Sequence, residues 1–167
     1  TTDKIGWLMG RRSEVLTSES ISQHDSVFVA QGIHGSGVFA RRQFVPNEII
    51  GEVTGELMRN RDYESDYCME VGEGLTLEPA APFRFLNHSC EPNCELFCWE
   101  DHDDPSMTTR LWISSLEDGI QPGDELTIDY AWPMESAIAC RCGADECRGW
   151  IIDEEELPDL LELLPPD

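Results

Sequence analysis

The densest group of chemically versatile side chains lies in residues 84–94, with the sequence RFLNHSCEPNC. Most of these side chains can make strong hydrogen bonds or bind a metal ion, and they follow directly on apolar residues. A buried polar group costs free energy unless it finds a partner. This stretch therefore predicts a binding site rather than an ordinary core strand.

A second group of reactive side chains is a run of closely spaced cysteines, Cys140, Cys142 and Cys147. This spacing favours a structural zinc site, which takes four ligands in a tetrahedron, over reduced thiols on an exposed turn. We favour Cys90 as the fourth ligand because it sits in the polar stretch, although spacing alone leaves Cys94 and Cys98 open. The odd total of 7 cysteines also argues for metal and free thiols over a disulfide framework.

Residues 34–40, with the sequence HGSGVFA, combine glycines with a preceding strand-like run. Glycine permits backbone conformations and close ligand approach that a Cβ would prevent. No long helix or acidic residue about 20 positions further on completes a dinucleotide-binding unit. The segment is either a ligand-gripping turn or a tight hairpin.

Asn87 and His88 are candidates for gripping a ligand, with a satisfied core cluster as the alternative. His88 beside Ser89 suggests a hydrolase, but adjacent residues on an extended strand point to opposite faces, so they do not form a nucleophile and base. Further along, alternation places Leu126, Ile128 and Tyr130 on one inward face. A buried phenol needs a hydrogen-bond partner, and taken alone Tyr130 is typical of a core residue.

The elements that must position these groups are mostly short strands. The predicted strands cover residues 26–30, 49–56, 66–71, 75–78, 95–99, 110–116 and 125–130. The leucines of the acidic tail from Asp153 follow a helical spacing, and Pro158 favours a short helix that begins near it. No helix-length periodic segment separates successive strands, so the chain reads as a mostly β domain rather than a doubly wound α/β fold.

The composition is strongly acidic. Thirty-four acidic residues against 11 basic ones give a formal charge of −23 across 167 residues. Such a charge repels nucleic acid and anionic membranes and attracts basic partners, although solubility or adaptation to salt is the plainer explanation. No apolar run approaches the roughly 20 residues that span a bilayer, and no signal segment is apparent, so we expect a soluble intracellular protein.

Taken in order, these features resemble the SET-domain protein-lysine N-methyltransferases. Residues 84–93 resemble the family signature RFxNHSCxPN, and residues 123–130 resemble GEELTxDY. Residues 34–40 are similar to the N-terminal glycine motif, and residues 140–149 resemble the post-SET pattern CxCx4CRG. The resemblance covers about residues 25–152.

The resemblance implies a SET-domain fold of several small β-sheets with a pseudoknot and few short helices. The polar stretch and the segment around Tyr130 would form that pseudoknot. The expected organisation is an N-terminal arm, a SET domain, a post-SET zinc-binding segment and an acidic tail with a possible short helix. Their expected ranges are residues 1–25, 26–135, 136–152 and 153–167.

The resemblance also implies S-adenosylmethionine as methyl donor and a bound Zn²⁺. By the same resemblance, Arg84 would face the carboxylate of S-adenosylmethionine, Asn87 would face its amino group and His88 would face its adenine. The full set of implied cofactor residues is His34, Gly35, Ser36, Gly37, Tyr67, Arg84, Asn87 and His88. The implied zinc ligands are Cys90, Cys140, Cys142 and Cys147.

Tyr130 would be the principal catalytic residue, orienting a lysine ε-amine in a channel formed with Ile128 and Trp132. Those two neighbours depart from the family's usual Phe or Tyr, so the number of methyl groups added is not predicted. The expected substrate is a basic, lysine-containing protein such as a histone or histone-like tail, with no direct nucleic acid or membrane partner, in the cytoplasm or nucleus. The alternative function is a catalytically inactive SET-like module that binds basic proteins.

Overall fold

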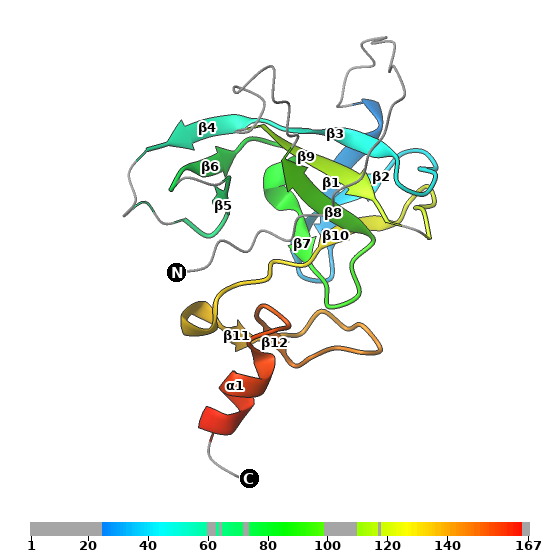
Figure 1. Ribbon diagram of the computed structural model, residues 1–167. Coiled ribbons are helices and arrows are strands. Elements are labelled where there is room, and N and C mark those ends of the chain that lie inside the picture. Colours follow the sequence, from blue (N-terminus) through cyan, green and yellow to red (C-terminus); the bar gives the residue numbers. More distant parts are fainter. Residues whose placement is uncertain are drawn as a thin grey trace.

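The computed structural model of the chain describes residues 25–59, 63, 65–71, 74–98, 110–116 and 118–164. The predicted N-terminal arm, apart from Asp25, lies outside these residues. Within them the chain forms several small β-sheets and few helices, as expected (Figure 1). No helix in the described part of the chain is long and apolar enough to cross a membrane.

The sheet that carries the polar stretch has four strands in the order β1-β2-β10-β7. Strands β1 (Val27–Gly32) and β2 (Gly35–Ala40) form an antiparallel hairpin, which confirms the hairpin interpretation of the glycine segment. Strand β10 (Glu125–Ile128) runs antiparallel to β2 and parallel to β7 (Asn87–His88). Two motifs far apart in sequence therefore lie side by side, as the expected pseudoknot requires.

Two further sheets complete the upper body of the molecule. One has the order β3-β9-β8, formed by Ile49–Val53, Leu111–Ser115 and Cys94–Cys98. The other has the order β4-β6-β5, formed by Gly55–Met58, Thr76–Pro79 and Met69–Glu70. A short 3-10 helix, η2 (Phe83–Phe85), leads directly into the polar stretch.

The C-terminal part lies below this body in Figure 1. It contains the 3-10 helix η4 (Met134–Ser136), a two-stranded sheet of β11 (Ile138–Ala139) and β12 (Trp150–Ile151), and helix α1 (Leu157–Leu163). Pro158 stands in the first turn of α1, where a missing backbone N–H has no consequence, so the helix prediction is confirmed.

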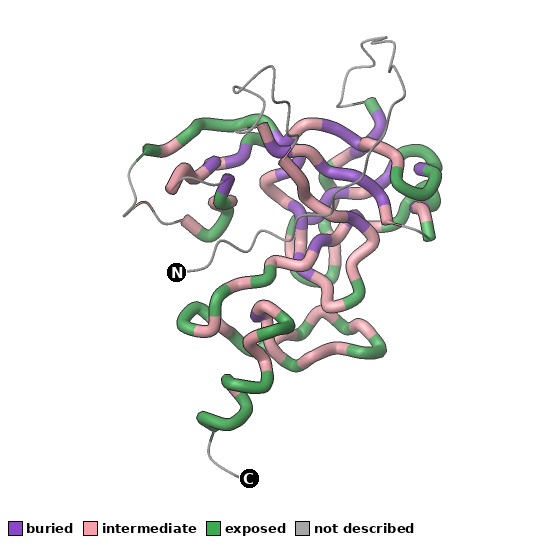
Figure 2. The backbone as a smooth tube through the Cα atoms, in the orientation of Figure 1, coloured by how far each residue is buried: buried purple, intermediate pink, exposed green. Residues whose placement is uncertain are grey.

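The hydrophobic core sits between the sheets of the upper body, where buried segments concentrate (Figure 2). Its fully buried side chains include Val38, Phe44, Ile113 and Leu126. Leu126 and Ile128 are buried and Tyr130 packs against them, so the predicted inward face of β10 is confirmed. That packing fixes the direction from which Tyr130 approaches the site.

Two strand predictions are wrong in extent. Residues 49–56 were expected to form one strand, but β3 ends at Val53 and β4 begins at Gly55 in a different sheet. The backbone of Thr54 instead accepts a hydrogen bond from the Ala80 N–H at 2.7 Å, and a Cβ on Gly55 would collide with the backbone of Glu78. The strand predicted over residues 66–71 shrinks to β5, Met69–Glu70.

Candidate active site and metal centre

The polar stretch meets β10 through backbone and side-chain hydrogen bonds that fix its register. Asn93 extends the pairing, because its amide donates to the Glu125 carbonyl at 2.8 Å and accepts the Thr127 N–H at 2.9 Å. The Ser89 N–H donates to the Ile128 carbonyl at 3.0 Å. Part of the polar stretch is therefore structural, and it holds Asn87 and His88 next to the strand that leads to Tyr130.

A first cavity of about 280 Å³ opens beside the hairpin turn. Its lining residues are His34, Gly35, Ser36, Tyr67, Arg84, Phe85, Leu86 and Asn87. The Arg84 guanidinium lies 4.3 Å from the centre of the Tyr67 ring, a cation–π contact, and 3.6 Å from a carboxylate oxygen of Glu78. That separation from Glu78 is longer than a normal hydrogen bond, so the guanidinium can bind an anion in the cavity.

A second cavity, of about 190 Å³, adjoins the first and shares His34 and Asn87 with it. Its remaining lining residues are His88, Tyr130, Arg141, Cys142 and Ile151. The wall of this cavity thus combines the upper body with the cysteine segment, which we define as residues 136–152.

The Tyr130 side chain, which lines the second cavity, is held in place by one hydrogen bond and two ring contacts. Its hydroxyl donates to the Leu86 carbonyl at 2.7 Å, and its ring lies 5.3 Å from Trp132 and 5.4 Å from His88, centroid to centroid. Burial, with a smaller contribution from the Glu125 carboxylate, raises the pKa of Tyr130 to about 12. The phenol is therefore protonated at neutral pH and acts through its hydrogen bonds and its ring rather than as a base.

The His88 imidazole is almost fully buried and links Tyr130 to the cysteines. The Tyr130 N–H donates to Nδ1 at 3.2 Å, so in the neutral ring the proton sits on Nε2, 3.4 Å from Cys90 Sγ. Burial lowers the pKa of His88, against a smaller opposing effect of Asp129, which keeps the ring neutral. Nε2 then donates toward sulfur and has no lone pair for a metal.

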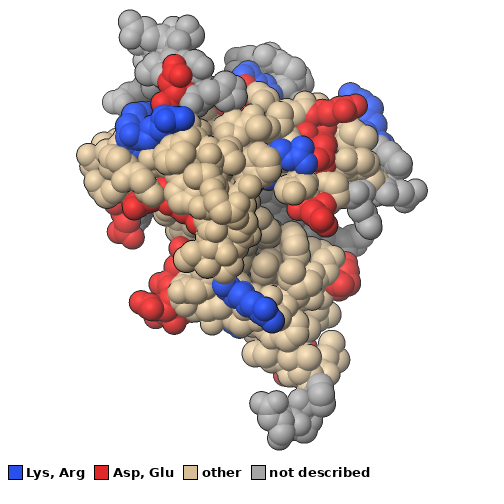
Figure 3. Space-filling model, turned by 180° about the vertical axis from the view of Figure 1, so that it is seen from behind, with Lys and Arg blue, Asp and Glu red and all other residues tan. Residues whose placement is uncertain are grey.

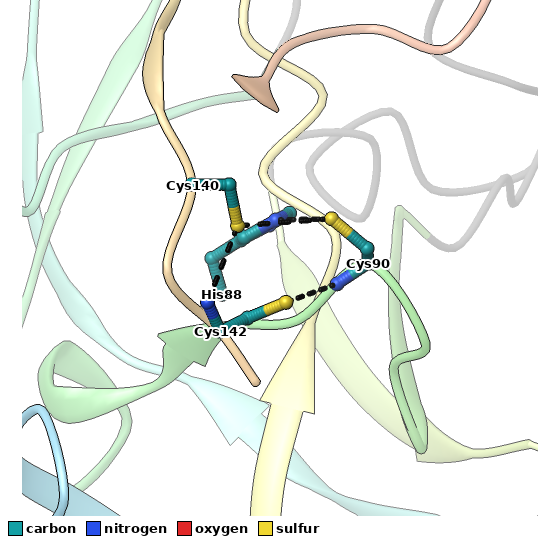
Figure 4. A group of neighbouring side chains, drawn as sticks. All are labelled: His88, Cys90, Cys140 and Cys142. Carbon is teal, nitrogen blue, oxygen red and sulfur yellow. Dashed lines mark hydrogen bonds between the residues drawn. The ribbon is translucent and has the colours of Figure 1, made fainter. Parts of the chain in front are cut away.

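Four potential metal-binding side chains are drawn in Figure 4: His88, Cys90, Cys140 and Cys142. Cys90 Sγ lies 3.7 Å from Cys140 Sγ and 3.9 Å from Cys147 Sγ. Sulfurs bound tetrahedrally to zinc at about 2.3 Å are about 3.8 Å apart, so these separations fit a zinc ion. The ligand atoms of His88, Cys90, Cys140 and Cys142 all lie within 4.8 Å of one another, so this group could hold a metal ion. Because the His88 Nε2 carries a proton, we expect Cys147 to take its place as the fourth zinc ligand, which stays a prediction.

Backbone N–H groups point at the sulfurs of Cys140 and Cys142, but of these two only Cys142 is shifted toward the thiolate form. Burial raises the pKa of Cys90 and raises the pKa of Cys140 to about 12. The Cys90 N–H points at Cys142 Sγ at 3.5 Å, and the Cys142 N–H at Cys140 Sγ at 3.4 Å. Burial raises the pKa of Cys142, but N–H groups of Cys90 and Ala144 outweigh it and lower the value to about 6. One thiolate is thus available at neutral pH before metal arrives.

The two other candidates for the fourth ligand lie elsewhere. Cys94 and Cys98 belong to β8, where Cys94 is buried and Cys98 packs against the core. Burial raises the pKa of Cys94 to about 12, so its thiol is inert.

An ion pair ties the cysteine segment to the strand end before Tyr130. The Arg148 guanidinium donates to both Asp129 carboxylate oxygens, at 2.7 and 2.8 Å. Its side chain is only 11% exposed, and the bidentate pair raises the pKa of Arg148. Sequence reasoning missed Asp129, Arg148 and Glu125, although all three stand inside the quoted motifs as charged residues beside apolar or metal-binding ones.

The structure brings most of the predicted cofactor residues together, since His34, Gly35, Ser36, Tyr67, Arg84, Asn87 and His88 line the two cavities. Gly37 lines neither, and a Cβ there would collide with Oε1 of Glu125. Of the predicted channel residues, Tyr130 lines the second cavity, Ile128 is buried in the core, and Trp132 stacks on Tyr130 without lining either cavity.

A family match and two similar relatives point to the same protein family. Residues 35–131 match the SET domain family. The chain is 32% identical over 138 residues to histone-lysine N-methyltransferase mes-4 of Caenorhabditis elegans, and 32% over 134 residues to trithorax of Drosophila virilis. These alignments cover 69% and 71% of this chain but 15% and 3% of the relatives, so the chain spans only a small part of either relative.

Among solved structures, the chain is similar to KRYPTONITE in a complex with mCHH DNA, H3(1-15) peptide and SAH. The TM-score is 0.65 at 26% identity, covering 75% of this chain and 29% of KRYPTONITE. The family match spans more than half of the residues and takes in β2, the polar stretch and β10, whereas Arg141, Cys142 and Ile151 of the second cavity lie outside it. The chain therefore belongs to the SET domain family.

Proposed function

We propose that the chain is an S-adenosylmethionine-dependent methyltransferase that modifies the ε-amine of lysine in a basic protein. The observation that carries this proposal is the pair of adjoining cavities that share His34 and Asn87. One is lined by polar groups suited to a small charged ligand, and the other contains the Tyr130 phenol. The relatives named as histone-lysine N-methyltransferases and the SAH in the KRYPTONITE complex support it.

The residues fit the methyl donor. Its carboxylate suits the Arg84 guanidinium, and its amino group suits the Asn87 amide oxygen. We assign the adenine to the second cavity, beside His88 and the cysteine segment. The cavities, at about 280 and 190 Å³, are together in the size range of small-ligand sites.

The four cysteines fit zinc on the sulfur separations and the surrounding N–H donors. We propose residues 136–152 as a post-SET zinc-binding segment, between a SET domain that ends near residue 135 and an acidic tail from Asp153. Zinc would stabilise the wall of the second cavity through Cys142.

When bound, S-adenosylmethionine supplies a methyl group on a positively charged sulfur, and a new nitrogen–carbon bond forms as the sulfur–carbon bond breaks. Lysine has a free pKa near 10.4, so its ammonium must lose a proton to water before the nitrogen can attack. Tyr130, with a pKa of about 12, does not take that proton at neutral pH. Its hydroxyl hydrogen is committed to Leu86, which leaves the oxygen lone pairs to orient the amine.

The test is methyl transfer from labelled S-adenosylmethionine to histones and a panel of other basic proteins. We expect Tyr130→Phe to lower the rate of methyl transfer by about 10²-fold or more, because a small misplacement of the reacting amine can slow a reaction by that factor. Transfer by the wild type no faster than by Tyr130→Phe would overturn the proposal. The inactive binding module, favoured only by the acidity, instead predicts weak or absent donor binding by calorimetry.

The net negative charge of the chain favours a positively charged substrate. Acidic side chains lie on both the upper body and the C-terminal part of the face in Figure 3, which suits a lysine-rich or arginine-rich tail. The H3 peptide in the KRYPTONITE complex makes a histone tail the first substrate to try and chromatin the first location. The absence of nucleic-acid contact rests on charge alone and stays a prediction, because that complex also carries DNA.

A further inference from the structure

Glu125 occupies a space that two glycines leave open. It begins β10 opposite Phe39 of β2, and its carboxylate lies against the hairpin. A Cβ on Gly37 would collide with Glu125 Oε1, and one on Gly32 would stand 3.2 Å from Oε2. The missing side chain at Gly37 therefore makes room for the Glu125 carboxylate rather than for a ligand, since Gly37 lines neither cavity.

The Glu125 carboxylate determines which way the Asn87 amide points. Asn87 Nδ2 donates one hydrogen to Glu125 Oε1 at 2.7 Å and the other to the Ser36 carbonyl at 3.1 Å. Reversing the amide would place its oxygen against two other oxygens, which is repulsive. Both donors of the amide are thus used on the protein.

The remaining atom of that amide is Oδ1, an acceptor. No donor to it occurs among the described residues, and Asn87 lines both cavities. An acceptor here suits a cationic N–H donor and disfavours an anion. Glu125 lines neither cavity, so it acts on a ligand only through Asn87.

We propose that Glu125 is a positioning residue that holds the Asn87 amide oxygen toward the ammonium group of the methyl donor, in the space that Gly37 leaves open. The inference rests on the proposed function for the identity of the ligand. It assigns Gly37 and Glu125 an indirect role, in which glycine admits the carboxylate and the carboxylate orients the amide.

The experiment measures S-adenosylmethionine affinity by calorimetry for wild type, Glu125→Ala and Glu125→Gln. Loss of a hydrogen bond to a charged group predicts about tenfold or more weaker binding for Glu125→Ala. Glu125→Gln should recover most of the affinity, because its amide oxygen still accepts from Asn87 Nδ2. Glu56→Ala, an exposed acidic residue of β4, is the matched control and should bind as the wild type does.

A double-mutant cycle separates positioning from general destabilisation. In an Asn87→Ala background, Glu125→Ala should weaken donor binding no further, because its effect passes through Asn87. Equal losses in the two backgrounds would overturn the inference. So would a Glu125→Ala variant with wild-type affinity.

A measurement made without S-adenosylmethionine tests the orienting role of Glu125 separately from the proposed function. In the wild type, NMR should show the Asn87 side-chain amide protons protected from exchange, and both Glu125→Ala and Gly37→Ala should remove the protection of the proton that Glu125 accepts. If the wild type binds no donor while this pattern holds, the proposed function fails and the orienting role of Glu125 stands. Unchanged protection in Glu125→Ala overturns the inference whatever the donor does.

Discussion

The upper body, residues 25–131, and the C-terminal part, residues 132–164, are held together by different forces. Core side chains such as Val38, Ile113 and Leu126 are fully buried in the body. Among the described residues after 131, only Ile152 is buried, and helix α1 has no buried side chain (Figure 2). Hydrophobic burial stabilises the body, whereas we expect the C-terminal part to depend on the proposed zinc ion together with hydrogen bonds and the Arg148–Asp129 ion pair.

The candidate site lies where these two regions meet. The body supplies Asn87, His88 and Tyr130, and the cysteine segment supplies the opposite wall of the second cavity. Contacts across the junction include the Asp153 N–H to the Trp132 carbonyl at 2.7 Å and the bidentate pair of Arg148 with Asp129. We therefore expect that loosening the C-terminal part would abolish the proposed methyl transfer while the upper body stays folded.

The largest expected effect is that of removing zinc. Structural zinc contributes roughly 10–16 kcal/mol of binding free energy in small zinc peptides, far more than any single contact in the cysteine segment. A chelator, or Cys142→Ser, should abolish methyl transfer and expose residues 136–152 to hydrogen exchange, with β9 and β10 still protected. The measurements are zinc content, exchange mass spectrometry and activity.

Cys68→Ser, a thiol outside the cluster, serves as the control and should retain zinc and activity. Loss of protection throughout β9 and β10 after chelation would show that the two regions are not separately stabilised.

The same truncation in each region should have different consequences. Ile113 and Ile152 are both 0% exposed. Ile113→Ala should lower the free energy of unfolding of the body by about 2–5 kcal/mol, because it leaves a cavity in a packed core. Ile152→Ala should leave the body's melting temperature nearly unchanged and speed zinc loss. Denaturant unfolding and zinc-release kinetics check this pair, and equal shifts in body stability would contradict it.

Breaking the ion pair across the junction should have an intermediate effect. Arg148→Ala leaves Asp129 half-buried without its partner, so we expect several-fold lower activity and faster exchange in residues 136–152. Arg148→Lys keeps the charge but not the bidentate geometry and should recover only part of the loss. A normal exchange pattern in Arg148→Ala would mean that zinc alone fixes the segment.

The pH dependence should reflect Tyr130 only in strong alkali. Folding raises its pKa from the ordinary 10.0 to about 12, so its contribution to stability is complete below about pH 10 and is lost as pH rises toward 12. Methylation should therefore rise with pH as the substrate amine deprotonates, with no decline from Tyr130 below pH 11. A pH–rate profile tests this, and an inflection near pH 8 that disappears in Tyr130→Phe would contradict it.

The smallest expected effect is that of the exposed acidic tail. Glu156 must be left intact because its carboxylate accepts the Met134 N–H at 2.6 Å. Neutralising exposed Glu154 and Glu162 to Gln should raise KM for a basic peptide less than about threefold, and 0.5 M salt should remove the difference. Asp118→Asn, exposed on the body, is the control, and an unchanged KM and salt dependence would exclude a role for the tail in attracting substrate.

Local patterns alone determined much of this protein. Alternation placed Leu126 and Ile128 inward, Pro158 marked the start of α1, and the motifs identified the polar stretch and the cysteine cluster, because these properties depend on neighbours in sequence. Only the tertiary structure decided that residues 49–56 split between two sheets, that Cys90 rather than Cys94 meets the cysteine segment, and that Gly37 makes room for Glu125. Each of these depends on contacts between segments distant in the chain, such as Asn87 with Glu125 or Cys90 with Cys140, which no local periodicity or spacing encodes.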